Sequence, residues 1–377
     1  MKRLFLLVFP ILLFWGCSEN PTEIGDAFID KNIDYFADTL SAVASSSFIF
    51  DMNTNASEVL FIGKYENIND ASMLIRFTMP SVDSIAARTK KIKILKAEIS
   101  LYPLYFIGNK NFNFEIKEIT KFWDYTANNS VIKQQVNAYL SQNILKNQKV
   151  TDTLLSLEID TNVVRNWLES VLYDTTKRNY GIKISSNSNG SIVAIRGYAP
   201  YTYSKIPAIN VTYFDIEKNK EFTITLNSTV DLSIFEGNFP FYDNSKYTVA
   251  QGSLAIASKV LFDLPQNFKK SVVNKARISF EVDTILSTKN FADSVYVTLL
   301  SSADSNLTYG GSYYIFKSSR KGFYEGDIVP LMQAIANEYV GNYGLKITYG
   351  RDINSIDKIY FKKNSFRLIL GYTQLKK

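Results

Sequence analysis

Residues 276–283 read Ala-Arg-Ile-Ser-Phe-Glu-Val-Asp, and this strict alternation indicates the fold class. The apolar side chains fall on one side of an extended chain and the polar ones on the other, which is the pattern of a half-buried strand in an antiparallel sheet. Residues 112–117, Phe-Asn-Phe-Glu-Ile-Lys, repeat it. Because Phe and Tyr are abundant and turn-forming clusters such as 186–190 separate the apolar runs, the sequence predicts an all-β protein.

Helical spacing is confined to three stretches. Asp160 or Thr161 is expected to cap a helix whose apolar residues recur at intervals of three and four: Val164, Trp167, Leu168, Val171 and Leu172. Asp327 is expected to cap a second helix, with Pro330 in its first turn. The third stretch, 130–145, is polar and rich in Asn and Gln, and we interpret it as an insertion between strands.

The chain also contains a diverged internal duplication, because four blocks occur twice in the same order. They pair 71–77 with 257–262, 95–100 with 274–279, Asn179-Tyr180-Gly181 with Asn342-Tyr343-Gly344, and 209–213 with 368–372. In each copy the capped helix precedes the Asn-Tyr-Gly block.

The distance between paired blocks shrinks from 186 residues (71 to 257) to 163 residues (179 to 342), so the first copy carries extra residues. The insertion at 130–145 accounts for most of them. This places a first domain at 38–215 and a second at 216–377, with the charged stretch 217–221 as a hinge.

The first copy resembles the DNRLRE domain, a relative of disaggregatase repeats found in secreted and surface bacterial proteins. The blocks that carry this resemblance are Leu-Ile-Arg-Phe with a following proline in 74–80, Ala-Glu-Ile-Ser-Leu in 97–101, Trp123, the helix with Trp167, Asn179-Tyr180-Gly181, and 207–213. The second copy lacks both tryptophans and has Phe262-Asp263 where the first has Arg76-Phe77, so its membership is inferred from the duplication.

What the resemblance implies is two tandem jelly-roll-type antiparallel β-sandwiches, each with a short helix before the Asn-Tyr-Gly strand. Some members of the family act as carbohydrate-binding modules, so a glycan is the implied partner. A shared fold is weak evidence for a shared function, however, because sandwiches carry many unrelated activities.

The N-terminal residues predict where in the cell the protein is located. Lys2 and Arg3 precede an apolar run, 4–15, that is too short for a membrane span of about 20 residues. Phe14-Trp15-Gly16-Cys17 resembles the lipobox of bacterial lipoproteins, and Cys17 is the only cysteine. We therefore expect a signal peptide at 1–16, lipidation of Cys17, and a polar tether at 17–37.

Several acyl chains on Cys17 would hold the protein stably at a membrane. Ser18, rather than an aspartate, follows the cysteine and favours the bacterial outer membrane, on its surface or periplasmic face. With Cys17 lipidated, the folded part contains no thiol, and no disulfide contributes to its stability.

The composition excludes several kinds of chemistry. The chain has no histidine, so it has no Ser-His-Asp triad, no Cys-His nucleophile and no His-ligated metal. A glycosidase that uses two carboxylates stays open, although nothing singles out such a pair among 36 acidic residues. Loss of Lys2 and Arg3 reduces the formal charge from +6 to +4, which is too small to indicate nucleic acid.

Candidate ligand-binding residues are Tyr198, Tyr201 and Tyr203, in a turn-rich segment between two strands. Half-buried loop packing is an equally good interpretation of them. Trp123 and Trp167 could stack on sugar rings, but their positions favour core packing.

Two further clusters each have two interpretations. Phe235, Phe239, Phe241 and Tyr242 favour a domain interface over a partner contact. The oxygen ligands of a structural Ca²⁺ are suggested by three aspartates: Asp283, Asp293 and Asp304. Their spacing is not that of an EF-hand loop, so solvated loops and no cofactor are the favoured interpretation.

The sequence thus favours a non-enzymatic surface lipoprotein that binds an extended polymer such as a polysaccharide or serves as an accessory envelope subunit. The first alternative is a structural or adhesive envelope protein with a protein partner. A glycoside hydrolase or lyase is the third hypothesis.

Overall fold

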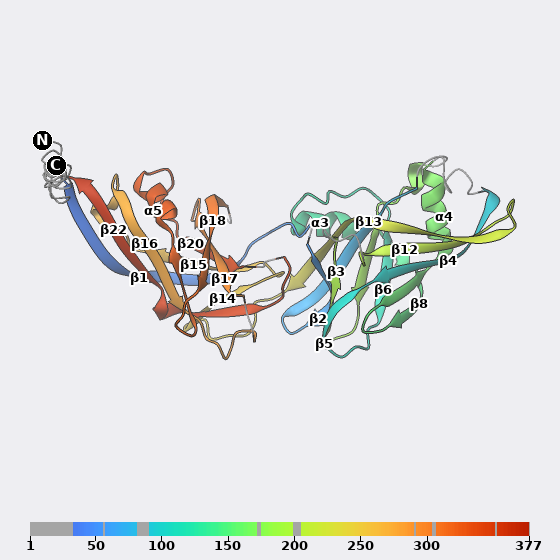
Figure 1. The fold of residues 1–377 in the computed structure, drawn as a ribbon, viewed down its shortest axis with the longest axis horizontal. Coiled ribbons are helices and arrows are strands. Elements are labelled where there is room, and N and C mark those ends of the chain that lie inside the picture. The colour runs from blue at the N-terminus through green and yellow to red at the C-terminus, as the bar shows by residue number, and fades with distance from the viewer. Residues whose placement is uncertain are drawn as a thin grey trace, which may run out of the picture.

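A computed structural model describes residues 33–55, 57–80, 90–171, 175–198, 205–289, 292–303, 307–350 and 353–376. Two strand-rich bodies lie end to end along the long axis (Figure 1). The described part is mostly β, which confirms the predicted class.

The C-terminal body contains one long sheet and the helix α5 (Val329–Ala336). In sheet order its strands are β1 (Ile33–Ile49), β22 (Arg367–Leu375), β16 (Val272–Glu281), β19 (Phe323–Asp327), β18 (Thr308–Lys317), β17 (Ser294–Leu300), β20 (Leu345–Tyr349), β15 (Ile256–Phe262), β14 (Tyr247–Gln251) and β21 (Lys358–Lys362). Because β1 also pairs with β15, the strands from β1 to β15 close on themselves, and β14 and β21 extend beyond the closure. We call this arrangement the closed sheet.

The N-terminal body contains the second sheet and the helices α3 (Asn129–Asn137) and α4 (Thr161–Ser170). Its main path is β5 (Pro103–Gly108), β11 (Ser191–Arg196), β2 (Val59–Tyr65), β3 (Ile68–Phe77), β13 (Lys220–Gly237), β12 (Ala208–Asp215), β4 (Ile92–Leu101), β9 (Leu155–Ile159) and β8 (Leu145–Val150). Off this path, β10 (Ile182–Ser186) pairs with β3 and with β6 (Phe114–Ile119), and β6 pairs with β7 (Leu140–Asn143). Short 3₁₀ turns are η2 (Thr175–Lys177), η3 (Gln266–Phe268) and η4 (Lys363–Ser365).

The two capped helices form where the sequence predicts them. Asp160 accepts a hydrogen bond from the Asn162 backbone N–H at 2.9 Å at the start of α4. Asp327 accepts one from the Val329 N–H at 2.9 Å, from the position before the cap residue of α5. The third predicted stretch, 130–145, is only partly helical, because the chain after α3 returns to the sheet edge and pairs with β6 as β7.

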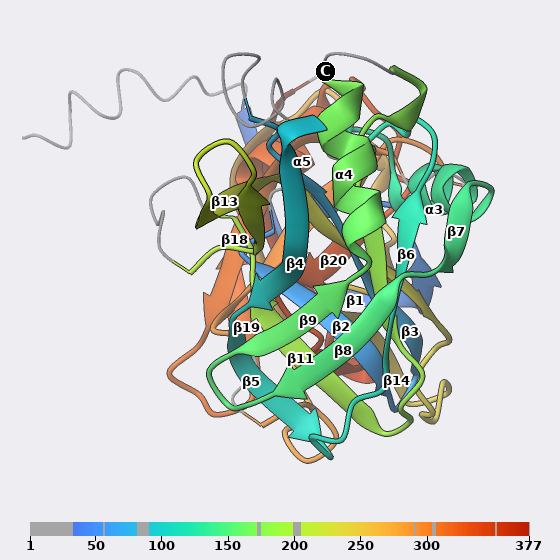
Figure 2. The ribbon, with the colours of Figure 1, turned by 90° about the vertical axis from the view of Figure 1, so that its right-hand side faces the viewer.

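Each body has its own apolar core. Phe280 lies in the C-terminal core and Trp167 in the N-terminal core, both fully buried. The indole N–H of Trp167 donates to Glu118 at 2.6 Å, and that of Trp123 donates to the Tyr180 carbonyl oxygen at 2.7 Å. Both tryptophans therefore belong to the packing, as their positions predict. Figure 2, which views the end of the N-terminal body, shows α4 beside β4 and β6.

The long strands β1 and β13 exchange places between the two copies. β1 precedes the first copy but pairs with β22 and β15 of the second. β13 precedes the second copy but pairs with β12 and β3 of the first. The division of the strands between the two sheets therefore differs from the expected ranges 38–215 and 216–377. The difference arises because the alternation of apolar and polar residues predicts a strand but does not identify its partner.

The exchanged strands occupy equivalent slots. Pairing with the neighbour shifts register between Ala42 and Ala44 in β1 and between Ser228 and Val230 in β13, which are positions 186 residues apart. Ser47 accepts a hydrogen bond from the Val249 backbone N–H at 2.8 Å, and its counterpart Ser233 accepts one from Phe61 at 2.8 Å.

The Asn-Tyr-Gly blocks are equivalent as well. The Asn179 amide donates to the Phe77 carbonyl oxygen at 2.9 Å, and the Asn342 amide donates to that of Phe262 at 2.8 Å. In both copies this bond ties the start of β10 or β20 to the end of its partner strand.

Candidate ligand-binding site

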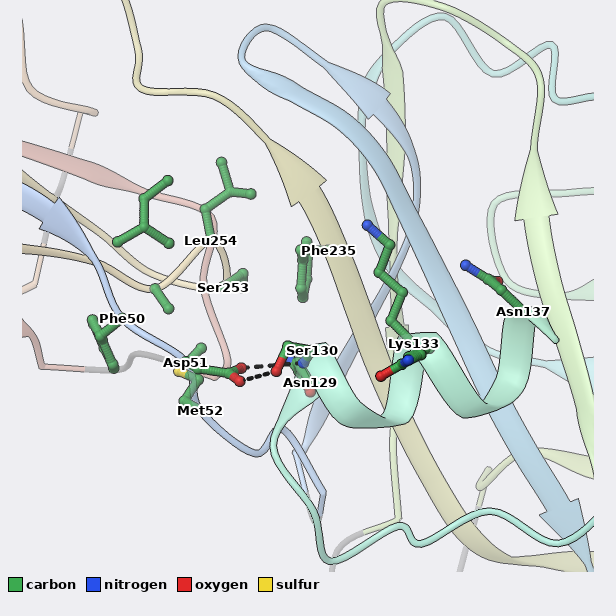
Figure 3. Close-up of a pocket in the computed structure, with 13 residues that line it drawn as sticks. Phe50, Asp51, Met52, Asn129, Ser130, Lys133, Asn137, Phe235, Ser253 and Leu254 are labelled. Atoms are coloured by element: carbon green, nitrogen blue, oxygen red, sulfur yellow. Dashed lines mark hydrogen bonds between the residues drawn. The ribbon is translucent and has the colours of Figure 1, made fainter. Parts of the chain in front are cut away.

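A groove lies at the junction of the two bodies. It encloses about 560 Å³ between α3 of the N-terminal body and the end of β1 with the β14–β15 turn of the C-terminal body. Phe235 stands between α3 on one side and Ser253 and Leu254 on the other (Figure 3). Clefts between domains are common places for ligand sites.

Hydrogen bonds across the junction fix the shape of the groove. The chain leaves the C-terminal body at Phe50, whose backbone N–H donates to the Ala255 carbonyl oxygen at 2.9 Å. It enters the N-terminal body at Met52, whose carbonyl oxygen accepts from the Asn129 N–H at 2.9 Å. Between them, the Asp51 carboxylate accepts from both the backbone N–H and the hydroxyl of Ser130 (Figure 3).

One wall of the groove is polar and the other apolar. Lys133, Gln134 and Asn137 of α3 form the polar wall, and Lys133 pairs with Glu236 at 2.8 Å. Phe235 and Leu254 provide apolar surface opposite. Amide, ammonium and hydroxyl groups beside an aromatic side chain suit a ligand that carries both hydroxyl groups and an apolar face.

A second candidate surface follows from the difference between the copies. In the N-terminal body, α3 and Trp123 cover the outer faces of β3 and β13, where the covered residues are apolar: Leu74, Val230, Leu232 and Ile234. Residues 120–139, which link β6 to β7, supply this cover, whereas only 301–307 link β17 to β18. The register places Lys259 where the first copy has Leu74, and Ser46 where it has Leu232.

This outer face of the C-terminal body, which we call the open face, carries a row of aromatic side chains. Tyr296 pairs directly with Tyr314, their ring centroids are 4.5 Å apart, and their hydroxyls hydrogen-bond at 3.0 Å. Phe316 stacks 6.1 Å from Tyr314, and these two side chains are 58% and 53% exposed. The row ends at Tyr296, because its neighbour on β20, Thr348, is buried.

The groove and the open face meet at Phe50. Phe50 lines the groove, and the Lys346 ammonium lies 3.3 Å from the centroid of its ring. Lys346 is paired with Lys259 and with Thr298 on the neighbouring strands. Phe50 and Lys346 are both largely buried, so this contact connects the two surfaces beneath the molecular surface.

The predicted site residues are largely separate from these surfaces. Cys17, Tyr201 and Tyr203 lie outside the described residues. Tyr198 is half-buried, and its backbone N–H donates to the Asp231 carboxylate at 3.0 Å. Neither the groove nor the aromatic row includes it.

Asp231, which accepts the hydrogen bond from the Tyr198 backbone, is a buried acid. Burial raises its pKa to about 6, although hydrogen bonds from the Tyr198 N–H and the Ser228 hydroxyl act in the opposite direction. A raised folded-state pKa means that the stability from this group is complete below its ordinary pKa of 3.8 and is lost as the pH rises through about 6.

We therefore expect Asp231→Asn to be increasingly more stable than the parent as the pH rises. The difference in the free energy of unfolding should grow by about 2 kcal/mol between pH 4 and pH 7.5. The two tryptophans among the described residues, Trp123 and Trp167, lie in this body, so urea unfolding followed by tryptophan fluorescence measures it. A difference independent of pH would contradict the expectation.

The other candidate clusters resolve as follows. Phe235 and Tyr242 pack into the apolar contact between the bodies, as predicted, whereas Phe239 and Phe241 are exposed. The Asp283 carboxylate accepts from the Ile285 and Leu286 N–H groups. Asp304 lies outside the described residues, among which no group of three or more acidic, Cys or His side chains is arranged to hold a metal.

The aromatic row could have been found in the sequence. Residues 313–316 read Tyr-Tyr-Ile-Phe, and their alternation places Tyr314 and Phe316 on one face and Ile315 on the other. Ile315 is fully buried. The missing signal was which face is covered, since two aromatic residues suit a core as well as a surface.

Comparisons with known proteins do not assign a family: no family model matches the chain, and no curated protein is detectably similar. Within the described residues, no helix has the length and apolarity to cross a membrane.

Proposed function

We propose that this chain is a non-enzymatic, lipid-anchored surface protein of the bacterial outer membrane that binds an extended polysaccharide. Its two bodies are diverged jelly-roll-type β-sandwiches of DNRLRE type in this proposal, and Cys17 is the lipidated residue. The observation that carries the binding role is the aromatic row on the open face, in which Tyr314 and Phe316 are exposed and Tyr296 is half-buried beside them.

Sugar rings have an apolar face that packs on aromatic rings, and hydroxyl groups that hydrogen-bond to polar neighbours. The open face offers both, because the Tyr296 and Tyr314 rings supply the aromatic surface and their hydroxyls supply polar groups beside it. A sheet surface is flat enough for a polymer to lie across several strands, and the groove lined by Phe50 is a second place where the same polymer could bind.

The test is retention on a panel of immobilised polysaccharides, using the chain with Cys17→Ala so that it stays in solution. We expect retention on at least one glycan and a loss of affinity of about 30-fold in the double variant Tyr296→Ala and Tyr314→Ala, because each stacking contact contributes about 1 kcal/mol. Tyr339→Ala is the matched control, since Tyr339 is 67% exposed and lies outside the row.

Two results would contradict this proposal. Retention on no glycan removes the binding role, and equal losses for the control and the double variant remove the aromatic row as its site. Release of new reducing ends from a retained polysaccharide would favour the hydrolase hypothesis instead.

The anchor has its own test. Cys17→Ala should move the protein from the membrane fraction to the soluble fraction of cells, because a multiply acylated cysteine supplies the membrane affinity. Immunoblotting of the two fractions measures it, with Ser18→Ala as a control that leaves the cysteine intact. Continued sedimentation of the Cys17→Ala chain with membranes would contradict lipid anchoring at this residue.

A further inference from the structure

The two bodies are joined by two different kinds of connection. The first is the chain segment 238–246, which runs from the end of β13 to the start of β14. The second is β1: the chain continues from it into the N-terminal body through residues 50–52, whereas non-covalent pairing holds the strand itself in the closed sheet of the C-terminal body.

β1 is held along its whole length. Its first half pairs with β22, from Ile33 opposite Leu375 to Ser41 opposite Arg367. Its second half pairs with β15 as far as Ile49 opposite Ile256. The Phe36 ring stacks 5.1 Å from that of Tyr372. A strand paired along its length and packed into a core is released only when the sheet opens.

Contacts between the bodies add to this attachment. Phe61 and Ile192 of the N-terminal body share an apolar cluster with Val249 and Tyr360 of the C-terminal body. The Ser57 hydroxyl lies 2.8 Å from the Ile353 carbonyl oxygen and 2.7 Å from Oδ1 of Asn354. Lys358 and Glu66 form an ion pair across the junction.

We propose that β1 is a clamp that holds the C-terminal body to the anchored part of the chain, independently of the connection at 238–246. This inference depends on the proposed lipid anchor in one respect only, which is that the N-terminal end of the chain is attached to a membrane. The tether from Cys17 runs directly into β1, so the anchor reaches the C-terminal body through this strand before it reaches the N-terminal body.

The experiment cuts the covalent connection in the full-length, membrane-bound protein. A specific protease site inserted after Phe241, which is fully exposed, allows cleavage of the connection, and a C-terminal tag follows the fragment 242–377. After complete cleavage we expect this fragment to remain with the membranes in buffer and to be released by urea, while the N-terminal fragment stays. Release without denaturant would overturn the clamp.

A cross-link identifies β1 as the attachment. Tyr35 and Thr373 are direct partners on β1 and β22, so Tyr35→Cys with Thr373→Cys should form a disulfide. In cleaved chains carrying this pair, we expect urea to release the fragment only when a reductant is added. Release in urea without reductant, despite formation of the disulfide, would overturn the assignment.

The experiment distinguishes failure of the proposed lipid anchor from failure of the proposed clamp. If the intact protein is found in the soluble fraction, the lipid anchor is wrong, and the clamp is then measured by co-elution of the two cleaved fragments in gel filtration. Separate elution under native conditions would overturn the clamp whatever the fate of the anchor.

Discussion

Phe280→Ala is expected to lower the free energy of unfolding of the C-terminal body by about 3–5 kcal/mol, the usual range for removing a buried phenylalanine. Phe280 is fully buried, and its ring lies 5.2 Å from that of Phe361, 5.4 Å from Phe366 and 5.7 Å from Tyr324. Alanine would leave a cavity among three rigid rings that have little room to move inward.

The measurement is urea unfolding followed by far-ultraviolet circular dichroism, which reports both bodies. Tryptophan fluorescence in the same samples reports the N-terminal body, since Trp123 and Trp167 both lie there. We expect the dichroism transition to move further than the fluorescence transition. Phe241→Ala is the matched control because Phe241 is fully exposed, and a shift as large as that of Phe280→Ala would contradict the packing argument.

Gly181→Ala is expected to destabilise the N-terminal body by more than about 3 kcal/mol. Gly181 has a φ of +104°, which L-residues rarely adopt, and a Cβ there would lie 2.4 Å from the Ile75 carbonyl oxygen. The clash lies in the pairing of β10 with β3, so the two strands would have to separate. Tryptophan fluorescence in urea measures the loss.

Two other glycines supply the comparison. Gly190 has a φ of +68°, and a Cβ added there would meet nothing within 4 Å, so Gly190→Ala should cost only about 1 kcal/mol. Gly344, the counterpart of Gly181 in the second copy, has a φ of +100° and a contact of 2.9 Å, so its effect should be large and confined to the C-terminal body. Equal effects at Gly181 and Gly190 would show that the clash carries no weight.

Local features of the fold are predictable from the sequence because local physics determines them. Asp160 caps α4, and Asp327, one residue before the cap of α5, likewise accepts from a backbone N–H two residues on. The buried face of β16 follows from alternation at Ile278 and Phe280. The duplication also places Asn179 and Asn342 correctly at equivalent bonds.

The exchange of β1 and β13 has no local signature. Each strand shows the same apolar and polar pattern whichever body receives it: Phe36 and Leu40 correspond to Phe222 and Leu226. The partners of β1 lie more than 200 positions away, as in the pairing of Ala42 with Phe262, and a single sequence offers no measure of such contacts.

The candidate site could not be predicted from the sequence for a related reason. The groove is formed by Asp51, Lys133 and Leu254, which are distant in sequence, and no spacing rule connects them. The open face depends on an insertion that one copy has and the other lacks, so its exposure follows from the comparison of the copies rather than from either alone.

The position of β1 also has a consequence for folding during synthesis. β1 is the first strand of the described chain to be made, but its partners are made much later: Ala42 pairs with Phe262, and Ile33 pairs with Leu375. Until the last residues emerge, the closed sheet cannot form and β1 is an unpaired edge, a state prone to aggregation. The slowest folding step of a protein with this topology should therefore be the closure of the C-terminal body, which needs both ends of the chain.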